Sequence, residues 1–240
     1  MQYEGNVFRP PSEARSLIIQ TTIGCSHNKC TFCYMYRDDV FRIRTQEEIL
    51  ADLDECSKLY PFVEKLFLAD GDALVIPYPR LLEIVTYAKS VFPKLRQITM
   101  YATARDILGK SMEELESLHK AGLDMLYIGL ESGSDAILKE INKNCTSEEF
   151  ITAVKRAKEA GMKCSVTIIL GLGQREKSRE HALETARVLS EAKPEYVAFL
   201  NLRFKPGTEL TKMVERGEFV RLNDVELLQE MKLFIQHLDS

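Results

Sequence analysis

The feature that most constrains the fold is a regular alternation of strand-like and helical segments along the 240 residues. Short runs rich in Ile, Leu, Val, Thr or Tyr end near Gly, Asp or Asn, which is typical of buried strands. These runs are Ser16–Thr21, Lys65–Ala69, Gln97–Tyr101, Met125–Leu130, Lys163–Leu170 and Tyr196–Leu202. Helical patterns lie between them, at Gln46–Leu59, Tyr78–Val91, Met112–Ala121, Ala136–Asn142, Ser147–Ala160 and Ser178–Glu191. Consecutive parallel strands need helical crossovers, so the pattern predicts a parallel α/β sheet.

Either an open doubly wound sheet or a partial (β/α)6 barrel satisfies this order of elements. Thr45 and Ser111, each with a glutamate three residues on, read as capping boxes that begin two of the helices. The pattern contains no proline-rich linker, so we expect a single domain. Its predicted parts are an N-terminal extension (1–14), the β/α region (15–222) and a final amphipathic helix (223–240).

Composition narrows the class of protein. The net charge of −4 gives no global attraction to nucleic acid or to an anionic membrane. No run approaches the roughly 18 uninterrupted apolar residues of a membrane helix, and the first residues lack a basic-then-apolar signal pattern. Six cysteines in such a chain predict reduced thiols and a cytoplasmic location.

In parallel β/α folds the chemistry lies at the carboxyl ends of the strands. Polar and glycine residues of this chain follow several of the predicted strands at that edge, so the sequence predicts a site there. The residues are Asp70, Gly71, Asp72, Tyr101, Thr103, Arg105, Glu131, Ser132, Gly171 and Arg203.

Three cysteines, Cys25, Cys30 and Cys33, follow the first predicted strand on one loop. Three thiolates can hold three corners of a cubane iron–sulfur cluster and leave the fourth iron open to a small molecule. A structural zinc site with His27 as the fourth ligand is an alternative, although no second CxxC pair exists. An electron-transfer cluster is another, and it needs a fourth thiolate such as Cys56 or Cys145.

At this point the chain resembles a radical S-adenosylmethionine (radical SAM) enzyme over nearly its whole length. The subgroup it resembles includes the oxygen-independent coproporphyrinogen dehydrogenase, the elongator catalytic subunit and the methylthiotransferases. Four residues separate Cys25 from Cys30, where the commonest family spacing is three. The resemblance implies a partial (β/α)6 TIM-like barrel of parallel strands, with a [4Fe–4S] cluster on Cys25, Cys30 and Cys33 and with SAM chelated to the open iron.

The resemblance also implies contacts to SAM. Asp70-Gly71-Asp72 is similar to the family's Gly-Gly-Glu motif, which places Asp72 at the SAM amino group. Lys143 falls where a basic residue holds the SAM carboxylate, and Glu131 or Ser132 is expected at the ribose. The remaining expected contacts are Phe32 beside the adenine and the partly kept fifth-strand motif residues Ile169 and Gly171.

The implied activity is reductive cleavage of SAM to a 5′-deoxyadenosyl radical that abstracts hydrogen from an unidentified substrate, an anaerobic oxidoreductase reaction. A flavodoxin or ferredoxin is the expected reductant, and a partner covering the open barrel is possible. Tyr101, Thr103, Arg105 and Arg203 are candidates for substrate contact.

The non-enzymatic alternatives are an iron–sulfur carrier and a zinc-stabilised interaction domain. His119, His181 and His237 lie in helical patterns and are expected at the surface.

Overall fold

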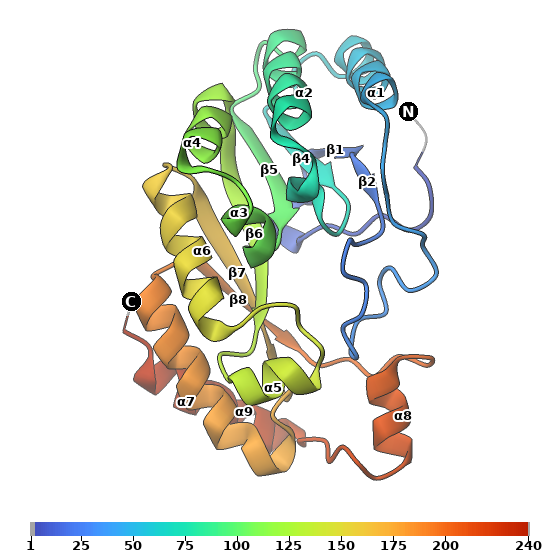
Figure 1. Ribbon diagram of the computed structural model, residues 1–240. Helices are drawn as coiled ribbons and strands as arrows, with labels where there is room; N and C mark the ends of the chain where they lie inside the picture. The colour runs from blue at the N-terminus through green and yellow to red at the C-terminus, as the bar shows by residue number, and fades with distance from the viewer. Residues whose placement is uncertain (1–2, 240) are drawn as a thin grey trace. The chain divides into compact units, whose positions relative to one another are not determined.

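The sheet is built from strands that follow one another in chain order. The computed structural model describes residues 3–239, and Met1, Gln2 and Ser240 lie outside them, so the outermost residues of the predicted 1–14 and 223–240 segments do too. Six strands form one parallel sheet in the order β1-β4-β5-β6-β7-β8 (Figure 1). Their bounds are Leu17–Gln20 (β1), Lys65–Ala69 (β4), Gln97–Ala102 (β5), Leu123–Glu131 (β6), Lys163–Leu170 (β7) and Tyr196–Asn201 (β8).

This order decides between the two architectures that the sequence left open. A doubly wound sheet reverses its strand order at a switch point, whereas here every strand of the sheet is followed by the next one along the chain. The order leaves β1 and β8 as the two edges, so the barrel is not closed. The predicted fold class, a partial β/α barrel of parallel strands, is confirmed.

The helices cover the crossovers as the periodicity predicted. Their bounds are Gln46–Leu59 (α1), Tyr78–Val91 (α2), Ala104–Leu108 (α3), Met112–Ala121 (α4), Asp135–Glu140 (α5), Ser147–Glu159 (α6), Gln174–Ala192 (α7), Glu209–Glu215 (α8) and Asp224–His237 (α9). Both predicted capping boxes form: the Thr45 hydroxyl accepts from the Glu48 N–H at 3.2 Å, and Ser111 accepts from Glu114 at 3.2 Å. None of the described helices is both long and apolar enough to cross a membrane.

Short elements escaped the sequence prediction. A two-residue antiparallel pair, β2 (Thr22–Ile23) with β3 (Arg42–Ile43), closes the base of the loop that carries the cysteines. Two 3-10 turns, η1 (Pro11–Glu13) and η2 (Ala73–Val75), and the short helices α3 and α8 were also missed. The missed strands and 3-10 turns have only two or three residues, which is too short for any periodic signal, and α3 and α8 are shorter than two turns of a helix.

Contacts divide the chain into two compact units. The first comprises Met1–Asn28, Met35–Ile128 and Arg156–Cys164. In it α1 packs against α2, and α2 against α4 (Figure 1). Its core includes a cluster of Ile18, Phe67, Ala69, Met125 and Tyr127.

The second unit comprises Lys29–Tyr34, Gly129–Lys155 and Ser165–Ser240. Helices α7 and α9 pack side by side in it (Figure 1). Phe199 of β8 meets Phe234 of α9 edge to face, with ring centroids 5.0 Å apart. The last helix is therefore part of this unit's core, and the predicted domain boundaries at 14 and 222 stay predictions.

Candidate functional site

The three cysteines of the motif follow β2 on one loop, as predicted. All six cysteines lie in the described part of the chain and are reduced thiols. Cys25 belongs to the first unit, and Cys30 and Cys33 belong to the second, where the Cys33 N–H donates to the Cys30 carbonyl at 3.2 Å. Within residues 3–239 no three His, Cys, Asp or Glu side chains are already arranged as a metal site. The donor set fits an iron–sulfur cluster, and its three-thiol assignment stays a prediction.

Hydrogen bonds of the backbone hold the turn between Cys30 and Cys33 within the second unit. The Thr31 N–H donates to the Ile141 carbonyl at 2.9 Å, just after α5. The Thr31 carbonyl in turn accepts from the Leu210 N–H at 3.0 Å, in the first turn of α8. Both thiols therefore sit on a segment whose main chain is anchored on two sides.

Gly71 is required where the loop after β4 approaches Cys25. A Cβ atom added at Gly71 would lie 2.5 Å from the ring of Tyr36 and 3.1 Å from the Cys25 Cβ atom. Tyr36 is itself buried, so its ring cannot simply move into solvent. Any side chain at residue 71 would therefore push the cysteine loop away from the β4 loop, which we define as Asp70–Asp72.

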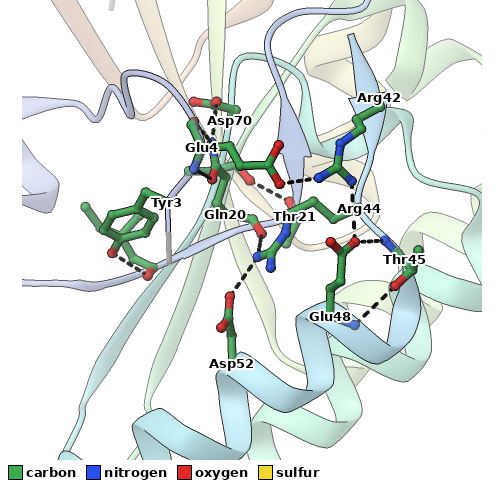
Figure 2. Close-up of polar contacts among 12 residues, drawn as sticks. Tyr3, Glu4, Gln20, Thr21, Arg42, Arg44, Thr45, Glu48, Asp52 and Asp70 are labelled. Atoms are coloured by element: carbon green, nitrogen blue, oxygen red, sulfur yellow. Dashed lines mark hydrogen bonds and ion pairs between the residues drawn. The ribbon is translucent and has the colours of Figure 1, made fainter. Parts of the chain in front are cut away.

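Asp70 is buried at the start of the β4 loop and is held by Gln20 at the end of β1. Figure 2 shows Gln20 between the main chain of Glu4 and Asp70: its Nε2 donates to the Glu4 carbonyl at 2.9 Å and to Asp70 Oδ2 at 3.1 Å. Burial raises the pKa of Asp70 to about 6, against the lowering effect of the hydrogen bond from Gln20. The hydrogen bond from Gln20 thus fixes the position of the Asp70 side chain, and burial removes part of its solvation.

Asp72 is the most strongly desolvated carboxylate of this loop and is fully buried. The Ser26 hydroxyl donates to its Oδ2, whereas its Oδ1 has no hydrogen-bond partner. Burial raises the pKa of Asp72, and the nearby carboxylate of Asp106 raises it further. The charge of Lys110 lowers the pKa of Asp72, but the Lys110 Nζ donates to the carbonyls of Leu74 (2.7 Å) and Ile76 (3.3 Å). An unsatisfied buried carboxylate oxygen fits the ammonium group of an amino acid.

Glu131 and Lys143 form an ion pair at the end of β6, in the second unit. Lys143 Nζ donates to Glu131 Oε1 at 2.9 Å, and both side chains are mostly buried. Burial alone lowers the pKa of Lys143, but the Glu131 carboxylate and the neighbouring Cys30 raise it above its ordinary value. The ion pair packs directly against Gly129. A Cβ atom added at this residue would lie 2.1 Å from Glu131 Oε1, so a larger residue does not fit there. Glu131 itself has a φ of +66°, an uncommon conformation for a residue other than glycine.

Ser132 is fully buried and contacts a histidine that was expected at the surface. The expectation for His181 is wrong: only 1% of it is exposed, because it lies on the face of α7 that packs into the second unit. Its Nδ1 lies 2.8 Å from Ser132 Oγ, and its Nε2 lies 3.1 Å from the Ile169 carbonyl. Burial lowers the pKa of His181 to about 4, so its ring is neutral near pH 7.

The other predicted cofactor contacts lie near one another in the second unit. Phe32 packs against a buried cluster that contains Ile169 and Leu172. Gly171 has a φ of +88°, the left-handed region that favours glycine. These placements are compatible with the predicted adenine side of a SAM site, which stays a prediction.

Of the four predicted substrate residues, two make contacts that stabilise the fold and two are exposed. Tyr101 packs edge to face on Phe67, with ring centroids 5.1 Å apart. Thr103 caps α3, since its hydroxyl accepts from the Asp106 N–H at 3.2 Å. Arg105 and Arg203 are exposed beyond the ends of β5 and β8. Substrate contact by these residues stays a prediction.

A cavity of about 580 Å³ lies at the other end of the strands. It is lined by residues at the amino ends of β1 and β4, among them Arg15, Leu17, Phe62 and Lys65. Parallel β/α folds place their chemistry at the carboxyl ends, so this cavity is not the candidate site.

The fold and the cysteine motif together define a class of protein. The chain belongs to the radical SAM superfamily, whose family model matches residues 19–186, more than half of the chain. That range contains the three motif cysteines and all the predicted SAM contacts from Phe32 to Gly171. A [4Fe–4S] cluster and SAM are the cofactors of this family of enzymes. The family predicted from the sequence is therefore confirmed.

Individual relatives share the core of this chain and extend beyond it. A probable threonylcarbamoyladenosine tRNA methylthiotransferase of Methanocaldococcus jannaschii is 29% identical over 163 residues, which cover 67% of this chain and 37% of the relative. Coproporphyrinogen III oxidase (HemN) from Escherichia coli superposes with a TM-score of 0.67 at 17% identity over 92% of this chain and 52% of that one.

A third relative was solved with a cluster in place. The methyltransferase TsrM from Kitasatospora setae, with cobalamin and a [4Fe–4S] cluster bound, gives a TM-score of 0.68 at 16% identity, over 87% of this chain and 41% of that one. At such identities the two solved structures show a common fold. This chain spans about half or less of the length of each of the three proteins.

Proposed function

We propose that this chain is a radical SAM enzyme that reductively cleaves SAM at a [4Fe–4S] cluster on Cys25, Cys30 and Cys33 and uses the resulting 5′-deoxyadenosyl radical to abstract hydrogen from a substrate. The observation that carries the proposal is the family match over residues 19–186, which includes the three-cysteine loop and the strand ends after β4, β6 and β7. When bound, the cluster supplies one electron to the sulfonium of SAM, which breaks a carbon–sulfur bond to leave methionine and the radical.

Asp72 is assigned to the amino group of SAM. Its buried Oδ1 lacks a hydrogen-bond partner, and its neighbour Asp106 destabilises the ionised form. An ammonium group would supply both a donor and a compensating charge, so the carboxylate gains most when that ligand is bound. Gly71 contributes by leaving room for the close approach of Cys25 and Tyr36.

Lys143 is assigned to the carboxylate of SAM, and Glu131 to the ribose. An ammonium group carries three donors, and the bond to Glu131 at 2.9 Å uses one of them. Lys143 can therefore hold a ligand carboxylate while Glu131 keeps it in place. The cationic form that this role needs is supported by the raised pKa of Lys143.

The finer features of the enzyme are also proposals. We assign it a low-potential reductant such as a flavodoxin or ferredoxin, a cytoplasmic location and oxygen-free working conditions, because the electron must reach the sulfonium without being lost to oxygen. The alternatives, an iron–sulfur carrier and a zinc-stabilised domain, are not favoured by the comparisons. A carrier predicts no turnover of SAM, and a zinc domain predicts a colourless protein that holds zinc after anaerobic purification.

The proposal is tested by measuring 5′-deoxyadenosine formation from SAM by anaerobically reconstituted, dithionite-reduced protein. A Cys25→Ala/Cys30→Ala/Cys33→Ala variant is the control. We expect product from the native protein and none from the variant, which cannot hold the cluster. A native protein with its full four irons that neither binds nor cleaves SAM would overturn the proposal in favour of a carrier.

A further inference from the structure

A buried histidine links the ends of two strands in the second unit. The His181 Nε2–H donates to the Ile169 carbonyl of β7, which can only accept, so the neutral ring must accept at Nδ1. The Ser132 hydroxyl therefore donates to His181 Nδ1 at 2.8 Å. One side chain of α7 thus holds both the residue after β6 and the main chain near the end of β7.

A buried glutamate of α9 makes the next link along β7. Glu230 is 2% exposed, and its Oε1 accepts from the Gly171 N–H at 2.7 Å. The Ser178 hydroxyl donates to its Oε2 at 2.6 Å, so both carboxylate oxygens are engaged. Glu230 Oε1 also lies 3.9 Å from His181 Nε2. Burying a carboxylate and an imidazole against the same strand end is costly unless each polar atom has a partner, and here they do.

We propose that His181 and Glu230 are positioning residues that hold Ser132, Ile169 and Gly171 in the conformation which receives the adenosine part of SAM. This inference rests on the proposed function, since the three residues they hold are predicted cofactor contacts. It assigns a role to α7 and α9, whose residues the cofactor itself need not touch.

The same geometry changes the role of Ser132. Its hydroxyl hydrogen is committed to His181, its oxygen accepts from the Ser134 N–H at 3.2 Å, and none of its surface is exposed. It is therefore a positioning residue, and of the two ribose candidates Glu131 is the one left to meet the ligand. Glu131 adjoins Ser132, so His181 also fixes the backbone that carries Glu131.

The test separates the two halves of SAM. His181→Phe fills a similar volume but leaves Ser132 and the Ile169 carbonyl without their partner. In anaerobically reconstituted protein we expect SAM binding about tenfold weaker, as the loss of a buried hydrogen-bonded anchor predicts. Binding of L-methionine, read from the change it makes in the electron paramagnetic resonance spectrum of the reduced cluster, should stay within twofold of native.

Conservative variants keep the test decisive if His181→Phe does not fold. His181→Asn retains an acceptor for Ser132, and Glu230→Gln retains one for the Gly171 N–H, so both should keep SAM affinity within about threefold. Glu230→Met, which removes the acceptor, should weaken SAM binding and speed hydrogen exchange in peptides that cover residues 168–172. His119→Phe is the matched control, because His119 makes a similar 3.1 Å contact to the Leu123 carbonyl at the opposite end of β6.

The outcomes distinguish this inference from the proposed function. Native protein that has its full iron content but does not bind SAM overturns the proposed function and this inference with it. Native protein that binds SAM, with His181→Phe or Glu230→Met binding it equally well, overturns the positioning role alone. Loss of SAM and methionine binding to the same degree also overturns it, since a general structural defect would act on both.

Discussion

Two buried carboxylates occupy the ends of β4 and β6, and their surroundings are opposite. Asp72 after β4 has an oxygen without a partner and a second carboxylate, Asp106, beside it. Glu131 after β6 is paired with Lys143 at 2.9 Å. We therefore expect a cationic ligand to stabilise the β4 loop, whereas the charge of Glu131 at the end of β6 is already compensated by Lys143.

Lys143→Met should give the largest effect, because it turns the balanced end of β6 into an unbalanced one. Removing one partner of a buried ion pair costs about 3–5 kcal/mol. For a chain of this size, each kcal/mol lost lowers the melting temperature by roughly 2–4 °C. Differential scanning fluorimetry measures this, and SAM binding should weaken in parallel while the cluster's absorbance is unchanged.

The double variant Lys143→Met/Glu131→Gln separates stability from binding. Neutralising Glu131 removes the uncompensated charge, so most of the lost melting temperature should return. SAM affinity should stay low, because no cation remains to hold its carboxylate. Full recovery of SAM affinity in the double variant would remove Lys143 from the proposed site.

The second unit should lose stability in acid through His181. Its pKa of about 4 in the folded protein lies below the unfolded value of 6.5, so its contribution is complete above pH 6.5 and is lost as the pH falls towards 4. This difference in pKa corresponds to a loss of about 3 kcal/mol in the free energy of unfolding once the pH is below both values. Buried Glu230, whose pKa burial raises, acts with the opposite sign, and nearby Glu180 favours the protonated ring.

Urea unfolding of native protein and of His181→Asn between pH 7.5 and 4.5 isolates this contribution, because Glu230 and Glu180 are common to both proteins. The native protein should lose stability relative to the variant as the pH falls. A constant difference across the range would show that His181 does not titrate through burial.

Asp72→Asn should have the reverse pH dependence and a smaller effect. Burial and Asp106 raise the pKa of Asp72 to about 9, so at pH 8 this group is mostly protonated in the folded protein and ionised in the unfolded chain, and the free energy of unfolding falls as the pH rises towards 9. An asparagine amide has no such pH-dependent cost and can donate to Asp106. Relief of an unsatisfied buried group is worth about 1–3 kcal/mol, so the SAM-free variant should melt a few degrees above native at pH 8. It should also lose the stabilisation that SAM gives the native protein. Glu83→Gln, at an exposed position of α2, is the control and should change neither property.

The pattern of apolar residues was sufficient to predict the six strands of the main sheet and the longer helices, because each of these elements buries one or both faces along its length. It wrongly placed His181 at the surface and made no prediction for Glu230, although the sequence carries a signal at both positions. His181 lies in register with Ala182, Thr185 and Leu189 on the buried face of α7, and Glu230 precedes buried Phe234 by four residues. A polar residue within an apolar stripe is either exposed to solvent or buried with hydrogen-bond partners. Only the partners, which lie on other elements, show which of the two holds.

Partners that lie far apart in sequence explain what else was missed. Ser26 meets Asp72 across 46 residues, and Gln20 meets Asp70 across 50. No local spacing rule links such pairs, so the predicted role of Asp72 rested on a motif resemblance, whereas the missing partner of its Oδ1 is visible only in the structure.

Cys56→Ala should have the smallest effect and tests whether the motif thiols suffice. Cys56 is buried in α1, and burial raises the pKa of its thiol, which disfavours the thiolate that a cluster ligand must be. The truncation should cost about 1 kcal/mol by leaving a small void, yet iron content per chain, measured by atomic emission after anaerobic reconstitution, should equal that of native protein. A loss of iron would make Cys56 a ligand and end the three-cysteine assignment. Retained iron would exclude Cys56 as a ligand of the cluster, as the three-cysteine assignment requires.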